Sequence, residues 1–413
     1  MKSISTLALA AALAAAGASV PAAAQNKAAA PAEAPTRKFD LSAEGRKAIA
    51  PLQAAVNAKD AAAYVAALPA AQAAAKTADD RYVIAQLQLS QAININDDAA
   101  KLAALEALLA SGGATAAELP RLYRNIGALS YNAKNFDRSA TALEKAIELE
   151  PNHTDSVLQL AEVRAQQKRP ADAVALIDRA IGLKKAAGET VPETWYKRGL
   201  KFAYEGRLAP QSQSFSRSLV QAYPTADNWH DALLIFRQAG GLDAEAELDL
   251  LRLSRATKSL RSENDYYVLA STLDRGSYFG ELQDLVREGT AAGKVKASNP
   301  SFGELTKRAS ARAAEDKAAL AGLVAKAQAD GSGRTALRVA DGYFGHGDYA
   351  KAAELYRTAA AKGSIDTDLA KTRLGISLAM LGQKAEAEAA FKSVGGKRAD
   401  LAGLWSLWLA QKS

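Results

Sequence analysis

The chain of 413 residues contains no cysteine, which excludes disulfide bonds, thiolate catalysis and cysteine-ligated metal sites. Histidine is nearly as scarce, because only His153, His230 and His346 occur, and no two of them have the spacing of a protease-type zinc site. The sequence also lacks the Gly-x-x-x-x-Gly-Lys phosphate loop and the Gly-x-Ser-x-Gly nucleophile motif. We therefore predict a protein that is not an enzyme and that has no catalytic residues, no metal site and no cofactor.

Long apolar runs and charge of one sign are also missing. Beyond the N-terminal region, no segment approaches the ~20 consecutive apolar residues that a membrane helix needs. The formal net charge is +7, and basic residues alternate with acids instead of forming a run of five or more. A nucleic-acid-binding surface needs a stripe of positive charge. These patterns predict no nucleic-acid partner and no membrane insertion of the mature chain.

The N-terminal 24 residues have the pattern of a Sec-type signal peptide. Lys2 supplies a short positive region, residues 7–18 are apolar and rich in Ala and Leu, and three alanines at 22–24 suit cleavage before Gln25. A membrane anchor is the alternative, but the apolar run is short for spanning. We therefore expect an exported, periplasmic protein whose residues 25–40 form a flexible leader rich in Ala and Pro.

A set of six positions returns after a step of 34 residues. Tyr123, Ile126, Gly127, Ser139, Leu143 and Ala146 recur as Val157, Leu160, Ala161, Ala173, Ile177 and Ala180. Each set has the spacing of two amphipathic helices, and its small residues let the helices approach closely. A fixed period of this length predicts a solenoid of stacked helix–turn–helix units, in which each unit buries its apolar face against the next.

The 34-residue pattern resembles the tetratricopeptide repeat family, in which each repeat is a pair of antiparallel helices, A and B. The clearest repeat spans residues 120–152, with its turn at 135–137, and the pattern is sharp again over 336–359. Trp405 and Trp408 fall where helix A of one further repeat would place its inner face, and no helix B follows. The resemblance implies an all-α fold: a right-handed superhelical solenoid of antiparallel helix pairs with a C-terminal capping helix.

The strength of the repeat pattern divides the rest of the chain into segments. We predict degenerate helical repeats over 41–118, repeats of the family over 119–296, a degenerate helical pair or hinge over 297–332, and repeats with the capping helix over 333–413. Residues 188–192 also contain the helix breakers Gly188 and Pro192. Each of the two weak zones, 188–192 and 297–332, is either a hinge or a longer loop between repeats.

The resemblance also implies a binding groove, lined by helix A side chains that point away from helix B. Carried over by position, its residues are Arg121, Arg124, Tyr131, Tyr196, Lys197, Arg334, Arg338, Asp341, Phe344 and Arg373. Guanidinium groups beside aromatic rings suit an acidic or C-terminal peptide, because Arg pairs with a carboxylate through two hydrogen bonds. The alternative is that these residues form solvated helix faces. Ala128 and Glu162 stand where family members that clamp a terminal carboxylate have Asn, so the sequence departs from that clamp.

Three functional hypotheses fit these patterns. The first is a non-catalytic periplasmic scaffold or adaptor that binds a protein or peptide partner of the cell envelope, in envelope assembly or in the export of polysaccharide or protein. The second is an accessory helical subunit that recruits a cell-wall or polysaccharide enzyme. The third is an enzyme whose site lies within residues 226–330. We favour the first, because an open repeat surface suits binding; the partner and the oligomeric state stay undetermined from the sequence.

Overall fold

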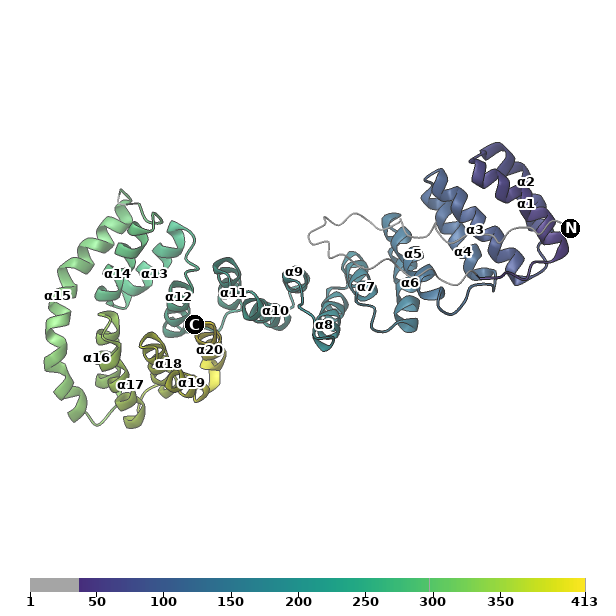
Figure 1. Cartoon of the computed structure of the whole chain (residues 1–413). Coiled ribbons are helices and arrows are strands. Elements are labelled where there is room, and N and C mark those ends of the chain that lie inside the picture. The colour runs from purple at the N-terminus through teal and green to yellow at the C-terminus, as the bar shows by residue number, and fades with distance from the viewer. Residues whose placement is uncertain (1–36, 297, 413) are drawn as a thin grey trace. The chain divides into compact units, whose positions relative to one another are not determined.

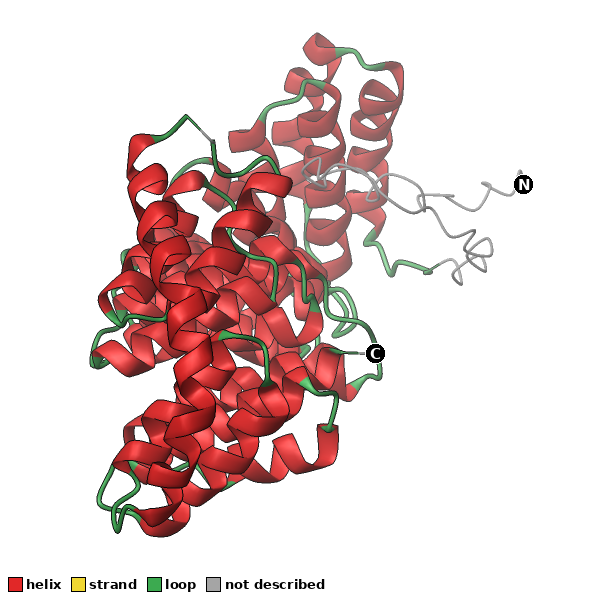
Figure 2. Ribbon diagram, turned by 90° about the vertical axis from the view of Figure 1, so that its left-hand side faces the viewer, coloured by secondary structure: helices red, strands yellow, loops and turns green. Residues whose placement is uncertain are grey.

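The described part of the chain consists of helices and the loops between them. A computed structural model describes residues 37–296 and 298–412, and no strand occurs among them (Figure 2). The predicted signal peptide and residues 25–36 of the predicted leader lie outside these residues. No helix in the described ranges combines the length and the apolar character that crossing a membrane requires. The helices form two compact units, divided between Val191 and Pro192.

Within the described residues, the first unit is a stack of four helix pairs (Figure 1). Its helices are α1 (Ala43–Ala58), α2 (Ala61–Ala74), α3 (Ala78–Asn94), α4 (Asp98–Ala110), α5 (Leu119–Asn132), α6 (Phe136–Leu149), α7 (Thr154–Gln166) and α8 (Pro170–Ala186). Each odd-numbered helix packs closely on the helix that follows it. The Asp97 carboxylate caps the start of α4 by accepting a hydrogen bond from the Ala100 amide at 2.9 Å. The polar turn residues of the sequence therefore separate the helices of each pair.

Close approach of the paired helices depends on small residues. Gly127 of α5 lies against Leu143 of α6, and a Cβ atom at Gly127 would lie 2.7 Å from Leu143 Cγ. The Ser139 hydroxyl of α6 donates a hydrogen bond to the Gly127 carbonyl oxygen at 2.7 Å. The small residues of the 34-residue pattern are thus the ones that let helices A and B touch.

The second unit, over its described residues, begins with three helix pairs and ends with two pairs and a single helix. Its helices are α9 (Glu193–Glu205), α10 (Ala209–Ala222), α11 (Ala226–Gln238), α12 (Ala244–Ala256), α13 (Glu263–Arg275), α14 (Phe279–Ala291), α15 (Pro300–Ala329), α16 (Arg334–Gly345), α17 (Tyr349–Lys362), α18 (Thr367–Met380), α19 (Lys384–Lys392) and α20 (Ala399–Gln411), with a 3₁₀ turn at Gly396–Arg398. The all-α solenoid of helix pairs is thus confirmed in both units, and α20 is the C-terminal capping helix.

One long helix, α15, occupies most of residues 297–332, for which the sequence predicts a degenerate helical pair or a hinge. Figure 1 shows α15 running along one edge of the second unit. Its sequence is rich in Ala and contains no proline after Pro300 and no turn motif before Gly331, so nothing interrupts the helix. Phe302 and Leu305 pack with α13 and α14, whereas Leu320 and Ala327 pack with α16. The single helix α15 therefore buries apolar residues of α13, α14 and α16, which a pair of helices would bury in a regular repeat.

The capping helix α20 closes the second unit onto its own earlier helices. One apolar cluster contains Trp405 and Trp408 of α20 together with Trp229 of α11. The Gln411 side chain accepts a hydrogen bond from Trp229 Nε1 at 3.1 Å and donates one to the Val220 carbonyl oxygen at 2.8 Å. These partners are 182 and 191 residues apart along the chain. The second unit is therefore a closed arrangement of repeats.

A buried ion cluster lies on α12 where the second unit closes. The Asp249 carboxylate accepts hydrogen bonds from Arg252 Nη1 at 2.9 Å and from Arg373 Nε of α18 at 3.1 Å. Arg252 also pairs with Glu281 of α14 at 2.7 Å, and Arg373 pairs with Asp341 of α16 at 2.8 Å. All five residues are at most 7% exposed. Burial alone would lower the pKa of Arg252 and Arg373, but the surrounding carboxylates raise it above its usual value, so both stay charged.

We predict that two glycine-to-alanine substitutions in the first unit have opposite effects on its stability. Gly127→Ala should destabilise the unit by about 1–3 kcal/mol, because the new methyl group overlaps Leu143. Gly182→Ala should stabilise it by about 0.5–1 kcal/mol, because no atom lies within 4 Å of the new methyl group in the middle of α8. Amide hydrogen exchange of peptides from α5–α8 measures both changes. Equal effects of the two substitutions would contradict the packing described for Gly127.

We predict that Arg373→Ala destabilises the second unit by about 3–5 kcal/mol, because it leaves Asp341 buried without its counter-ion and removes one of the two guanidinium partners of Asp249. Arg334→Ala, which removes an exposed guanidinium from α16, should change stability by about 0.5 kcal/mol or less. All four tryptophans of the chain lie in the second unit, so tryptophan fluorescence during urea unfolding reports on this unit alone. Similar unfolding midpoints for the two variants would show that the cluster does not support closure.

Candidate functional site

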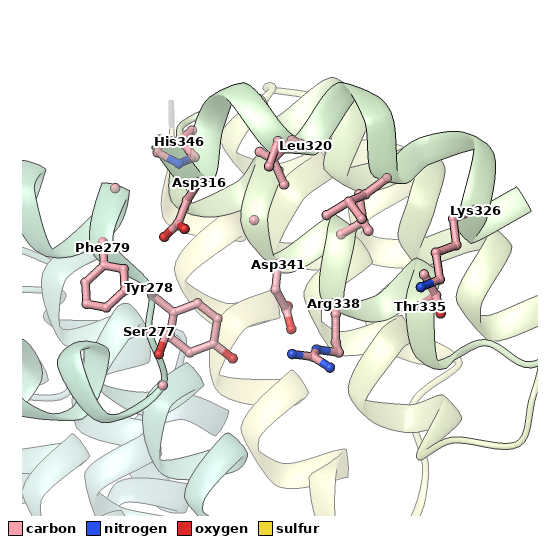
Figure 3. Close-up of a pocket in the computed structure, with 17 residues that line it drawn as sticks. Ser277, Tyr278, Phe279, Asp316, Leu320, Lys326, Thr335, Arg338, Asp341 and His346 are labelled. Carbon is pink, nitrogen blue, oxygen red and sulfur yellow. The ribbon is translucent and has the colours of Figure 1, made fainter. Parts of the chain in front are cut away.

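A cavity of about 480 Å³ lies beside α15 in the second unit. Its walls are the turn between α13 and α14, the middle of α15, and one side of α16 (Figure 3). A cavity of this size can hold a small molecule or the side chains of a bound protein segment. We refer to it as the α15 pocket.

Glycines let the walls of the α15 pocket meet closely. A Cβ atom on Gly342 of α16 would lie 2.5 Å from Leu320 Cδ2 of α15. A Cβ atom on Gly280 at the start of α14 would lie 2.5 Å from His346 Nδ1. The pocket is therefore bounded by backbone and side chains in direct contact, and larger residues at these glycines would force its walls apart.

Tyr278 and Asp341 border both the α15 pocket and the buried ion cluster. The Tyr278 ring lies 5.2 Å from the Arg252 guanidinium. Asp341 Oδ1 accepts hydrogen bonds from Arg373 Nη1 at 2.8 Å and from the Tyr356 hydroxyl at 2.6 Å. Burial raises the pKa of Asp341, and the Arg373 charge opposes this rise. Burial, with the nearby Asp341 carboxylate, raises the pKa of Tyr278 to about 12, so its hydroxyl keeps its proton at neutral pH.

Three charged side chains of the α15 pocket are available to a ligand. Within the described residues, the side chains of Asp316, Lys326 and Arg338 make no hydrogen bond or ion pair. Lys326 and Arg338 are exposed, and Asp316 is half-buried. His346 differs from them, because burial and the neighbouring Lys317 lower its pKa and favour the neutral ring. The α15 pocket therefore offers both donors and acceptors of hydrogen bonds.

A second cavity, of about 230 Å³, is lined by residues of α12, α14, α16, α17, α18 and α20. Its charged groups are mostly paired with one another: Arg252 with Glu281 at 2.7 Å, and Arg255 with Glu288 at 2.8 Å. Since these pairs leave fewer groups for a ligand, the α15 pocket is the stronger candidate site.

Three of the predicted groove residues lie in the first unit. Arg121 is exposed on α5, and Arg124 forms an ion pair with Glu150. Tyr131 is half-buried and packs edge-on against Phe136 with 5.6 Å between the ring centroids. The other seven predicted residues belong to the second unit, so the predicted set is divided between the two.

Three of those seven residues are exposed. Lys197 on α9 pairs with Glu193 at 2.8 Å. Arg334 and Arg338 lie one turn apart on α16, and of these two only Arg338 lines the α15 pocket. That these exposed residues bind a peptide stays a prediction.

The other four predicted groove residues are Tyr196, Asp341, Phe344 and Arg373, and all are buried, so the expectation that they line an open groove is wrong. Tyr196 packs against the Tyr223 ring at 6.3 Å, and Phe344 lies 4.6 Å from the Arg252 guanidinium. For Asp341, Phe344 and Arg373 the reason is the closure of the second unit. Helix α12 fills the space that the inner side chains of α16 and α18 would otherwise face, although Asp341 still reaches the α15 pocket.

The repeat pattern of the sequence does not single out Tyr278, Asp249 or Arg252. For the two charged residues a signal was present, because they interrupt a leucine-rich stretch between Leu248 and Leu253, where a helix buries its side chains. Charged residues inside an apolar stretch indicate a buried ion pair. Tyr278 lies in a turn, and its place in the pocket depends on α15 and α16, so its local sequence carries no comparable signal.

Comparisons with known proteins point to one repeat family. Two family models of the tetratricopeptide repeat match the chain, one over residues 131–185 in the first unit and one over residues 337–400 in the second. No curated protein matches.

Solved structures are similar at low sequence identity. A structure from a functional characterization of Pseudomonas aeruginosa pilF is 17% identical, with 64% of this chain and 96% of that chain covered and a TM-score of 0.27. A tetratricopeptide repeat protein from Parabacteroides merdae is 15% identical, with 71% and 99% covered and a TM-score of 0.28. A structure of the TPR2AB-domain:pHSP90 complex of yeast Sti1 is 13% identical, with 72% and 100% covered and a TM-score of 0.26.

The family assignment rests on the two repeat models and on the helix pairs that they match. Residues 131–185 include α6, α7 and all but the last residue of α8, and residues 337–400 include α17, α18 and α19. Both segments carry the antiparallel pairs that the 34-residue pattern predicts, and repeats of this kind serve in general as scaffolds that bind proteins. The chain therefore contains tetratricopeptide repeats, with matched repeats in each of its two units.

Proposed function

We propose that this protein is a non-catalytic scaffold of the cell envelope that binds a segment of a partner protein in the α15 pocket after export to the periplasm. The observation that carries the proposal is the pocket itself. It lies between repeats, it is bounded by three elements, and the unpaired side chains of Asp316, Lys326 and Arg338 line it. A charged side chain on a pocket wall without a partner in its own chain is available to a bound molecule.

The closed second unit supports binding at the α15 pocket over binding along an open concave groove. Helix α12 already contacts the inner side chains of α16 and α18 through Asp249 and Arg373. A partner segment would have to displace the buried ion cluster to reach those side chains, at a large cost in free energy. The α15 pocket is open to solvent and needs no such rearrangement, since Lys326 and Arg338 are exposed at its edge.

The proposal of a periplasmic location is supported by the N-terminal sequence. Residues 1–24 combine a positive start, an apolar centre and small residues before Gln25, as secretory signal peptides do. The absence of cysteine is compatible with an oxidising compartment, because no thiol is present to form unwanted disulfides there.

We predict that a photo-crosslinking amino acid at Leu323, which is 39% exposed in the pocket wall, captures a discrete partner protein in living cells. Ala319→Trp should abolish the adduct, because Ala319 lines the pocket and the indole would fill it. Ala321→Trp is the matched control: Ala321 is also exposed on α15 but does not line the pocket, so the adduct should persist. An adduct that survives both tryptophan substitutions, or no adduct at all, would be evidence against a partner in the α15 pocket.

We predict that the exported protein begins at Gln25 and is recovered from the periplasmic fraction of a Gram-negative host. Placing Arg at both Leu9 and Leu13 should keep the full-length chain in the cytoplasm, because charge in the apolar centre prevents recognition as a signal peptide. Cell fractionation with N-terminal sequencing makes the measurement. A periplasmic protein that still carries residues 1–24 would indicate a membrane anchor instead.

A further inference from the structure

The charged groups of the α15 pocket are not evenly distributed. Figure 3 shows Asp316, Tyr278 and Asp341 around one part of the pocket, with the Arg338 guanidinium beside Asp341 and with Lys326 beside Thr335 in another part. The pocket therefore has an end rich in acceptor oxygens, to which α15, α16 and the turn before α14 each contribute one group. We refer to Asp316, Tyr278 and Asp341 as the acidic end.

Asp341 has one carboxylate oxygen without a donor. Its Oδ1 atom accepts both hydrogen bonds of the side chain, from Arg373 and from Tyr356, whereas Oδ2 accepts none from the described residues. Asp341 is only 7% exposed, and it lines the α15 pocket. A carboxylate oxygen on a pocket wall that has no donor in its own chain is free to accept a hydrogen bond from a bound molecule.

The ion cluster behind the acidic end contains more negative than positive charge. Its buried carboxylates are Asp249, Glu281 and Asp341, and its buried guanidinium groups are Arg252 and Arg373, which leaves one negative charge in excess. Glu245, at the edge of the cluster, pairs with the same Arg373 and adds another negative charge. Each guanidinium is already shared between carboxylates, so the excess is not compensated within the cluster. A cation at the pocket-facing Asp341 would compensate it.

Tyr278 adds a second acceptor beside Asp341. Its hydroxyl makes no hydrogen bond with the described residues, and Figure 3 shows the ring turned into the pocket near Asp341. A phenolic oxygen accepts hydrogen bonds from ammonium and guanidinium groups. Together with the free Asp316 carboxylate, Tyr278 and Asp341 surround the space with acceptors, which is the environment that a basic side chain needs.

We infer that the acidic end of the α15 pocket holds a lysine or arginine side chain of the partner segment, whose cationic group donates to Asp341 Oδ2 and to the Tyr278 hydroxyl. This inference rests on the proposed function, since it names the chemistry of the segment that the pocket binds. The exposed Arg338 lies three residues before Asp341 on α16, near enough to repel the incoming cation. Arg338 therefore weakens binding of a basic side chain, whereas it would strengthen binding of an acidic one.

Capped pentapeptides test this inference on the purified mature protein. Their sequence is Gly-Ala-X-Ala-Gly, with X as arginine, lysine, norleucine or glutamate, and binding is measured by titration calorimetry. The arginine and lysine peptides should bind at least about tenfold more tightly than the norleucine peptide, which corresponds to one charge-assisted hydrogen bond. The glutamate peptide should bind more weakly than the norleucine peptide.

Substitutions in the pocket separate a cation site from an anion site. Arg338→Ala should tighten binding of the arginine peptide by about threefold or more, because it removes a repelling charge. The matched control Arg334→Ala, on the same helix but outside the pocket, should leave binding unchanged. Asp341→Asn should abolish the preference for arginine. Since this change could also disturb the ion cluster, Tyr278→Phe and Ala319→Trp provide two tests that leave the cluster carboxylates in place.

The outcomes distinguish this inference from the proposed function. Preference for the glutamate peptide, with loss of binding in Arg338→Ala, would overturn the inference and make the pocket an anion site. Equal binding of all four peptides would also overturn it. In either case the in-cell adduct from Leu323 and its loss in Ala319→Trp would still support a partner in the pocket. An adduct that persists in Ala319→Trp, or the absence of any adduct, would instead overturn the proposed function.

Discussion

Asp249 accepts hydrogen bonds from two buried guanidinium groups, and the second unit is built around this arrangement. Neither Arg252 nor Arg373 could stay buried without a carboxylate partner, because an unpaired buried charge costs several kcal/mol. Arg373 lies on α18 and Asp249 lies on α12, 124 residues earlier in the chain, so their pair forms only when the repeats close. Trp405 of α20 also contacts Asp249, because its Nε1 donates a hydrogen bond to the Asp249 carbonyl oxygen at 3.2 Å.

Closure changes what a repeat surface can bind. In an open solenoid the inner side chains of successive helices face a shared groove. In the second unit α12 occupies that position for α16 and α18, and Arg373 becomes part of the interior. The accessible polar groups then lie elsewhere, in the α15 pocket, where a single helix of 30 residues spans the distance between α13 and α16. Helix α15 is therefore both the irregular element of the repeat array and one wall of the candidate site.

Much of the local structure follows from patterns within about 40 residues. The 34-residue spacing around Gly127 and Leu143 predicts the paired helices, because small and large residues must alternate where two helices touch. The Asp97 cap of α4 is equally local, because the carboxylate accepts from the amide only three residues further on. A continuous helix α15 is also compatible with the sequence, since no proline and no turn motif separates Pro300 from Gly331, although the repeat pattern favours a helical pair or a hinge there. The exposure of Arg334 and Arg338 agrees with their polar helix positions.

What the sequence by itself determined is the repeat architecture, its helix pairs and its capping helix, because these depend on neighbouring segments and on the periodicity of apolar residues. Only the tertiary structure decided that Arg373 and Asp341 are buried, that Tyr278 stands beside them, and which side chains line the α15 pocket. The physical reason is sequence separation. Asp249 lies 124 residues before Arg373, so the residues around Arg373 do not indicate that the two side chains pair. A polar helix face has the same local sequence whether solvent or another helix covers it.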